Sequence, residues 1–160
     1  LASCLAHILD RLVAYNDRIP LDPSRLTRFH SRAAPAISIN DYLARIVRYT
    51  SLETACLLSI LLYIDRVCAA HPTFTIASLT VHRFIIAAVT VSAKAICDTY
   101  CTNAHYAKVG GVSCTELNAL ELELLRMVEW RLFCQKDTLQ RYYVNLVQQH
   151  PDYRLAAPPA

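Results

Sequence analysis

Residues 102–113 read TNAHYAKVGGVS and contain both glycines of this 160-residue chain, side by side at Gly110 and Gly111. On both sides of this segment the sequence is rich in Leu, Ile, Val and Ala, with a spacing typical of helices. We therefore expect a structural turn at the two glycines between two buried helices, because glycine adopts positive φ and lets backbones pack closely. A turn does not explain the polar residues upstream, which are Asn103, His105, Tyr106 and Lys108.

The composition of the whole chain favours an all-α protein of one domain. Hydrophobic residues make up 54% and charged residues 18%, so several helices should be buried on more than one side. The longest uncharged apolar stretches, 54–64 and 84–93, are about half as long as the roughly 20 residues of a membrane span, so we expect no membrane partner. The seven cysteines include no CxxC pair, which indicates a reduced, intracellular protein.

Apolar periodicity and capping patterns divide the chain into helices and one long connector. Residues 20–37 contain three prolines and three arginines with little periodicity, which predicts an extended connector. The sequences SIND at 38–41, TSLE at 50–53 and SCTE at 113–116 each resemble a capping box at a helix start. The predicted helices are 2–16, one beginning at Ser38, one from the second box to about Ala70, 79–100, 113 to about 130, and 137–149, followed by a loose tail, LAAPPA.

No motif for catalysis is present, so we expect neither an enzyme nor a cofactor. The chain lacks the glycine patterns of dinucleotide and phosphate binding, the HExxH of zinc proteases and the GxSxG of serine hydrolases. Cys97, Cys101 and His105 are spaced four apart, which would place them on one helical face and leaves a zinc site open. A structural zinc site takes four ligands, so the alternative is two core cysteines and a loop histidine.

Three charged residues conflict with their local surroundings. Lys94 interrupts an apolar helix, and Asp98 follows one turn later, in the weaker orientation for an ion pair and near a helix end that disfavours negative charge. Glu121 has leucines at i−4, i+3 and i+4, so its carboxylate needs hydrogen-bond donors or a position at a rim. One explanation of these charges is structural: Lys94 and Asp98 form an ion pair within their helix, and Glu121 lies at the rim of the core. The other explanation is that Lys94 and Glu121 face a partner, through apolar contacts and a few charged hydrogen bonds.

Four segments, in this order, resemble the cyclin box of the P-type (P/U-type) cyclins. They are FHSRAAPAISINDYLARIVRYT (29–50), LLYIDRV (61–67), TVHRFIIAAVTVSAKAICD (80–98) and TNAHYAKVGGVSCTELNALELELL (102–125). The resemblance covers about residues 26–132. It implies a compact five-helix cyclin box at 38–134, with an extra N-terminal helix at 1–19 and a C-terminal helix and tail at 135–160, all in one globular unit. A second five-helix box does not fit in this length.

The resemblance also implies a function. It implies a regulatory subunit, without catalysis of its own, that binds and activates a cyclin-dependent serine/threonine kinase by holding its αC helix and activation loop in the active arrangement. Lys94 and Glu121 match the family's lysine and glutamate that contact the kinase beside αC, and Asp98 matches an acidic residue placed to pair with a kinase arginine. A kinase inhibitor protein is a further partner that the resemblance allows, and the localisation expected is nuclear, cytoplasmic or both. The expected apolar anchors for the kinase are Phe84 and Val91, together with Ala87 and Leu125.

A second reading of the same fold is a transcription adaptor that binds DNA or a general factor. Five arginines cluster in the connector and in the helix after it, at positions 25, 28, 32, 45 and 48. The net charge of +3 is weak, so we do not expect nucleic acid as the main partner. The connector sequence RLTRFHSR is either solvated or in contact with the kinase or its substrate.

Overall fold

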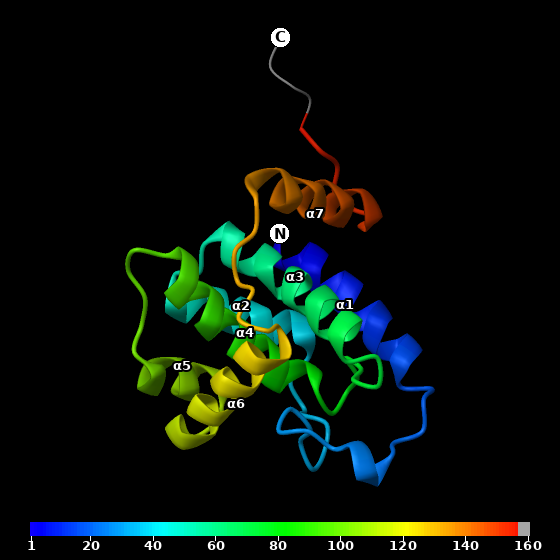
Figure 1. Ribbon diagram of the computed structural model, residues 1–160. Coiled ribbons are helices and arrows are strands. Elements are labelled where there is room, and N and C mark those ends of the chain that lie inside the picture. Colours follow the sequence, from blue (N-terminus) through cyan, green and yellow to red (C-terminus); the bar gives the residue numbers. More distant parts are fainter. Residues whose placement is uncertain (157–160) are drawn as a thin grey trace.

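A computed structural model of the chain describes residues 1–156, which form helices joined by loops (Figure 1). The all-α class is therefore confirmed. The elements are α1 (Ala2–Asn16), the 3-10 turn η1 (Pro23–Arg25), α2 (Ile39–Thr50), α3 (Thr54–Ala70), α4 (Val81–Ile96), α5 (Asn103–Gly110), α6 (Cys114–Met127) and α7 (Lys136–Gln149). Helices α2 to α6 form the expected five-helix unit, with α1 and α7 outside it. The tail predicted to be loose includes residues 157–160, which lie outside the described residues.

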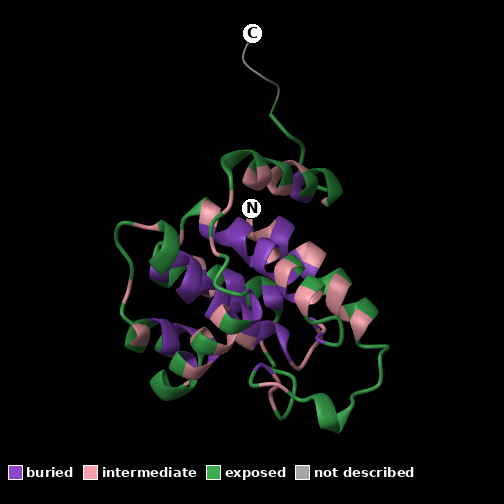
Figure 2. Cartoon of the chain, in the orientation of Figure 1, coloured by how far each residue is buried: buried purple, intermediate pink, exposed green. Residues whose placement is uncertain are grey.

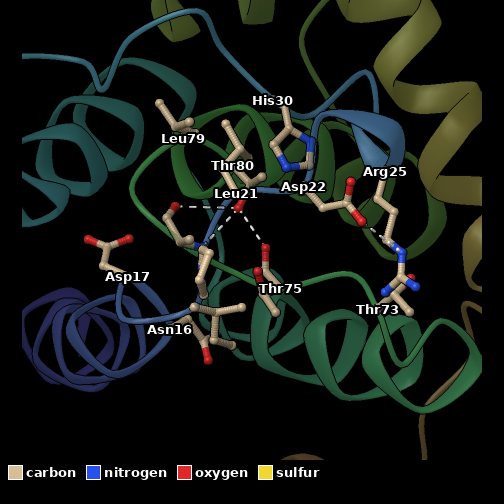
Figure 3. Close-up of a pocket in the computed structure, with 13 residues that line it drawn as sticks. Asn16, Asp17, Leu21, Asp22, Arg25, His30, Thr73, Thr75, Leu79 and Thr80 are labelled. Carbon is tan, nitrogen blue, oxygen red and sulfur yellow. Dashed lines mark hydrogen bonds and ion pairs between the residues drawn. The ribbon is translucent and has the colours of Figure 1, made fainter.

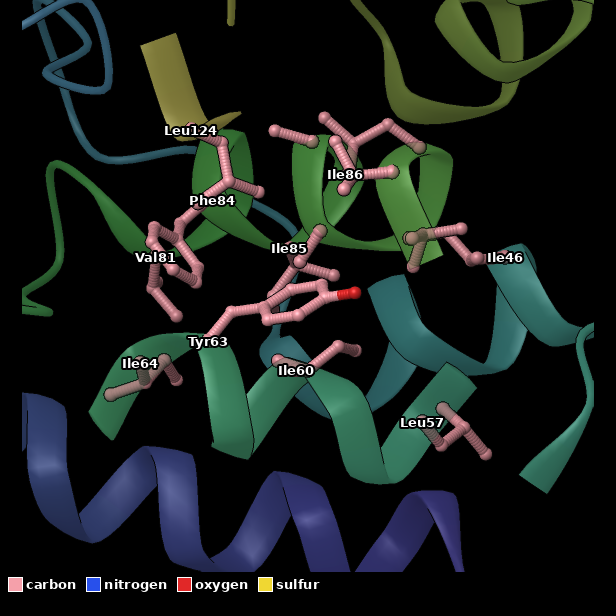
Figure 4. Close-up of a cluster of buried hydrophobic side chains, with 14 of the residues drawn as sticks. Ile46, Leu57, Ile60, Tyr63, Ile64, Val81, Phe84, Ile85, Ile86 and Leu124 are labelled. Atoms are coloured by element: carbon pink, nitrogen blue, oxygen red, sulfur yellow. The ribbon is translucent and has the colours of Figure 1, made fainter. Parts of the chain in front are cut away.

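The core is built around α3 and α4, which pack against each other in the middle of the molecule (Figure 2). Both helices are apolar on nearly every side, which is the pattern of a helix surrounded by others. Tyr63 of α3 lies between the two helices and faces Ile85 of α4, as Figure 4 shows. Helix α6 covers another side of α4, while α1 packs on α2 and α7.

Two of the three predicted capping sites are confirmed. The Ser38 hydroxyl accepts a hydrogen bond from the Asp41 amide at 3.1 Å and begins α2. The Ser113 hydroxyl accepts one from the Glu116 amide at 3.0 Å and begins α6. Each serine thus satisfies an amide that the first helical turn leaves without a partner.

The capping box predicted at 50–53 is wrong. Thr50 is still the last residue of α2, and its hydroxyl donates to the Ile46 carbonyl at 2.6 Å. Ser51, with a φ of 50°, ends α2 in the left-handed conformation, and α3 starts after Glu53 without a side-chain cap. The threonine side chain is used inside its own helix, so the sequence pattern was misleading.

The segment at 102–113 contains a short helix, α5, where the sequence predicted only a reversal. Gly111 has a φ of 73° and forms the C-cap, so the turn prediction is confirmed there. Gly110 is still helical, and it is glycine for another reason. A Cβ at this position would overlap Ile86 Cγ1 and lie 2.9 Å from Cδ1, so α5 approaches α4 as closely as glycine permits.

Two helices end earlier than predicted. Helix α4 stops at Ile96 instead of residue 100, because Cys97 takes an extended conformation. Helix α6 stops at Met127 instead of near residue 130, because Glu129 and Trp130 both have positive φ. The chain then runs as an irregular segment to α7.

The connector at 20–37 is extended apart from η1, as predicted, but it is not simply solvated. Phe29 is fully buried, with its ring centroid 5.3 Å from that of Phe84 and 5.7 Å from that of Phe74. The Ser31 amide also donates to the Leu79 carbonyl at 2.8 Å. These contacts fix the connector to the start of α4. Among the helices of residues 1–156, none is both long and apolar enough for a membrane crossing.

Candidate functional site

Lys94 and Glu121 form an ion pair at the edge of the core. Lys94 lies in the last turn of α4 and Glu121 lies in the middle of α6, and these helices pack side by side. The Lys94 Nζ is 2.9 Å from Oε1 and 3.1 Å from Oε2 of Glu121. The side chains are 34% and 15% exposed, so the pair lies where a partner can reach it.

Two asparagines extend this ion pair into a network across three helices. The Asn103 Nδ2 group, in the first turn of α5, donates to Glu121 Oε2 at 3.0 Å. It also donates to Asn118 Oδ1 at 2.6 Å. Glu121 therefore finds the donors that its leucine-rich surroundings require, from Lys94 and from Asn103.

Asp98 does not share a helical face with Lys94, so the predicted spacing along one helix is wrong. The physical reason is the end of α4 at Ile96, after which Cys97 is extended. Asp98 lies exposed in the loop that leads to α5. It remains close to Lys94 in sequence, but its carboxylate is free to face solvent.

Phe84 and Val91 are not at the surface, so the expectation that they anchor a partner needs correction. Both are buried in the core, and so is Ala87. Phe84 packs on Phe29, because α4 is enclosed by α3, α5, α6 and the connector along this part of its length. Of the four anchors considered, only Leu125 of α6 is partly exposed.

An apolar groove is lined in part by Ala95 and Ile96, the two residues that follow Lys94, and the sequence did not predict it. The groove has a volume of about 420 Å³ and is formed where the end of α4 meets the segment between α6 and α7. Its lining residues are Ala95, Ile96, Leu132, Phe133, Cys134 and Leu139. Phe133 is 80% exposed and Ile96 is 39% exposed, which is unusual for such side chains. The only signal in the sequence was the aromatic run EWRLF at 129–133, which has no helical period.

Arg66 holds one wall of this groove in place. It projects from α3 and donates to the Phe133 carbonyl at 2.8 Å and to the Arg131 carbonyl. These bonds satisfy the backbone of a segment that has no helix or strand of its own. The groove is therefore a fixed feature, in which α3 supports residues 131–133.

The comparisons with known proteins agree with this architecture. The family model for cyclins matches residues 3–132. The chain belongs to the cyclin family. Its relatives include proteins named as U-type and P-type cyclins, so the P/U-type resemblance is confirmed.

Three relatives show the range of similarity of this cyclin. The Nuc-1 negative regulatory protein preg of Neurospora crassa is 47% identical over 157 residues, which are 96% of this chain and 32% of the relative. The PHO85 cyclin PHO80 of Saccharomyces cerevisiae is 45% identical over 132 residues, 80% of this chain and 45% of the relative. Cyclin-U1-1 of Arabidopsis thaliana is 36% identical over 149 residues, 91% of this chain and 71% of the relative. The chain thus spans less than half the length of the two fungal proteins.

The cysteines near the end of α4 do not share a helical face, contrary to the spacing argument. In this cyclin Cys97 ends α4, Cys101 lies in the loop and His105 is in α5, where its Nε2 donates to the Tyr49 carbonyl at 2.7 Å. Cys97 Sγ lies 3.5 Å from Cys56 Sγ, and burial raises the pKa of the Cys97 thiol to about 12. Within residues 1–156, no three side chains of His, Cys, Asp or Glu are grouped so as to hold a metal ion.

Three of the five arginines of the connector and α2 have side-chain partners within the cyclin. Arg25 pairs with Asp22 at 3.3 Å. The guanidinium groups of Arg45 and Arg48 lie over the rings of Tyr42 and Tyr49, at 5.2 and 5.3 Å from the centroids. The basic residues are therefore partly engaged within the molecule, which weakens the argument for a DNA-binding surface.

A second groove, of about 360 Å³, lies between the end of α1, the connector and the loop before α4 (Figure 3). Its titratable groups are bonded to near neighbours. The Asp17 carboxylate accepts from the Ser78 amide at 2.9 Å, and His30 Nδ1 accepts from the Thr27 amide at 2.9 Å. The Ser24 hydroxyl donates to Asp22 at 2.7 Å and lowers the pKa of that carboxyl. These bonds occupy the titratable groups of this second groove and leave the Lys94–Glu121 pair as the candidate site.

Proposed function

We propose that this cyclin is the regulatory subunit of a cyclin-dependent serine/threonine kinase, has no catalysis of its own, and acts in the nucleus, the cytoplasm or both. Membership of the cyclin family supports the proposal. Further support comes from two relatives whose names describe a PHO85 cyclin and a PHO85 cyclin-like protein. The kinase to test first is therefore PHO85 of Saccharomyces cerevisiae.

The observation that carries the proposal is the partly exposed Lys94–Glu121 pair, whose lysine lies in the same last turn of α4 as the groove residues Ala95 and Ile96. An ammonium group has three protons, and both Lys94 contacts within residues 1–156 go to Glu121, so one proton remains for a partner. Among residues 1–156, Glu121 Oε1 accepts only from Lys94, so one of its lone pairs is left for a partner. A donor and an acceptor side by side suit a main-chain carbonyl and amide of the kinase, near its αC helix.

The groove supplies the apolar part of the same interface. Ile96, two residues after Lys94, and Phe133 are exposed at this groove, and Trp130 is also exposed on the segment that carries Phe133. Large apolar and aromatic side chains around a pocket are the usual centre of a protein–protein interface. We assign the groove to an apolar side chain of the kinase, in place of the buried Phe84 and Val91.

Activation follows as a shift between two kinase conformations. A rigid surface that binds only the form with αC in its active position favours that form by its differential affinity. A change from mostly inactive to mostly active kinase requires about 5 kcal/mol of such difference. We assign to Asp98 the pairing with a kinase arginine that helps to order the activation loop, and its exposure in the loop beyond Lys94 supports this assignment.

The test is to titrate the purified chain into purified PHO85 and measure both association and substrate phosphorylation. We expect a stoichiometric complex and a large increase in phosphorylation rate that saturates with the complex. A duplex DNA of random sequence serves as the parallel titration. Absence of kinase association, together with salt-sensitive DNA binding, would overturn the proposal in favour of a transcription adaptor.

A further inference from the structure

We propose that Asn103 is a positioning residue for kinase binding, which acts by fixing the carboxylate of Glu121, with Asn118 as its support. The inference rests on the proposed function, because it assumes that Glu121 contacts the kinase. It concerns the polar residues upstream of the glycine pair, which the turn at Gly110 and Gly111 leaves unexplained.

The hydrogen-bond inventory of the Asn103 amide fixes its orientation. Its Nδ2 has two protons; one donates to Glu121 Oε2 at 3.0 Å and the other to Asn118 Oδ1 at 2.6 Å. Both acceptors belong to α6, one turn apart, so the amide bridges from α5 to two points on the same helix. A rotated amide would place its oxygen against two acceptors, and this arrangement is therefore disfavoured.

Asn103 is not needed to cap its own helix. Thr102 is the N-cap of α5, and its hydroxyl accepts from the His105 amide at 3.2 Å. Asn103 follows as the first helical residue, where its side chain has no capping role and instead reaches across to α6. Replacing it with alanine, a strong helix former, should therefore leave α5 intact.

The consequence for Glu121 is a carboxylate held in one orientation before the kinase arrives. Lys94 alone bridges both oxygens and is itself 34% exposed, so it can move with the carboxylate. The bond from Asn103 adds a contact from a different helix to Oε2 and leaves Oε1 with a free lone pair. A glutamate side chain that is already ordered loses less conformational entropy on binding, and affinity rises accordingly.

A double-mutant cycle on kinase affinity tests the inference with the whole chain and PHO85. Asn103→Ala should weaken binding about fivefold to tenfold, which is within the range for the net contribution of one intramolecular hydrogen bond, because Asn103 acts through Glu121 and does not bond to the kinase itself. In a Glu121→Ala background the same substitution should change affinity by less than about twofold, because the group that Asn103 orients is gone. A residue with a merely structural role would weaken both backgrounds equally, and that result would overturn the inference.

Two further variants serve as a stronger disruption of the same contacts and as a matched control. Asn103→Asp places an oxygen against Glu121 and Asn118 and should weaken binding more than the alanine variant. Asn40→Ala, at an exposed asparagine in the first turn of α2, is the matched control and should leave affinity unchanged. Should a thermal melt show that Asn103→Ala is unfolded, Asn118→Ala at an exposed position provides the same cycle.

The outcomes separate this inference from the function on which it rests. Wild-type affinity for Glu121→Ala would overturn the assigned site itself. Weakened binding for Glu121→Ala, with unchanged binding for both Asn103 variants, would overturn only the role of Asn103. Weakening by Asn103→Ala that disappears in the Glu121→Ala background is the result that supports it.

Discussion

The two ends of α4 differ in what surrounds them, although they belong to one continuous helix. Every residue from Phe84 to Ala93 is buried, whereas Lys94, Ala95 and Ile96 are exposed. The first part packs against α3, α5, α6 and the connector and serves as the scaffold of the box. Only the last turn is left for a partner, and it carries both the lysine of the ion pair to Glu121 and two residues of the apolar groove. A long apolar helix can thus be mostly core and still offer one binding turn at its end.

The largest effect is expected in the buried part of α4. Phe84→Ala should lower the free energy of unfolding by about 3–5 kcal/mol, because it removes a buried ring that packs on Phe29 and leaves a cavity. Denaturant titration followed by circular dichroism measures this loss. A stability loss under 1 kcal/mol combined with lost kinase binding would mean that Phe84 belongs to the interface after all.

The next effect concerns the glycine pair that packs against the same part of α4. Gly110→Ala should destabilise the fold by about 3 kcal/mol, because the new methyl group overlaps the buried Ile86. Gly111→Ala should cost only about 1 kcal/mol, for its positive φ, since the nearest atom to an added Cβ is Arg45 Nη2 at 3.8 Å. Thermal melts of the two variants show which substitution destabilises the fold more. A larger loss of stability for Gly111→Ala than for Gly110→Ala would contradict the close approach of α5 to α4.

At the exposed end of α4 the expected effect is on binding and not on stability. Lys94→Glu should weaken PHO85 binding about 30-fold, or about 2 kcal/mol, because it removes the donor and places two carboxylates together. The free energy of unfolding should fall by less than about 1 kcal/mol, since Lys94 is partly exposed. Isothermal titration measures the affinity, with Lys108→Glu on the exposed side of α5 as the control. Equal binding by the two variants would remove Lys94 from the interface.

The smallest effect is the pH dependence of the buried end. His82 donates from Nε2 to the Ile37 carbonyl at 2.8 Å, and burial, with a smaller contribution from Arg45, lowers its pKa below the usual 6.5. The unfolded chain therefore binds a proton that the folded chain resists, so stability should fall as pH drops below about 6.5. His82 changes the free energy of unfolding by at most about 1.4 kcal/mol per pH unit. This contribution stops once the pH falls below the pKa of His82 in the folded chain. His82→Gln should reduce the slope between pH 7 and pH 5.5; an unchanged slope would assign it to other groups, such as His30.

The sequence was sufficient for most of the helices and for the need of Glu121 for hydrogen-bond donors. Apolar spacing and the serine caps at Ser38 and Ser113 are local signals, and they located α2 and α6 correctly. The position of Glu121 among leucines required nearby donors, and the structure supplies them. Local rules were sufficient for the helix starts because each cap depends on residues within one helical turn. The identity of the donors to Glu121, which come from α4 and α5, did not follow from local rules.

Apart from the capping box at 50–53, the failures involve tertiary contacts or irregular backbone. Whether Phe84 and Val91 face a partner or the core depends on which helices enclose α4, and periodicity cannot show this for a helix that is apolar all round. The groove requires the positive φ of Glu129 and Trp130 and the bonds from Arg66 to a segment 65 residues later in the chain. The early end of α4, which separates Asp98 from Lys94, could not be predicted because no proline or glycine closely follows Ile96 in the sequence.

Hydrogen–deuterium exchange of the chain, alone and bound to PHO85, tests most directly where the kinase is held. We expect the kinase to slow exchange at the end of α4, in α6 around Glu121 and in residues 130–133, while the connector at 20–37 and the start of α4 keep their rates. Protection confined to the connector and α2, with none at Lys94 or residues 130–133, would contradict the account.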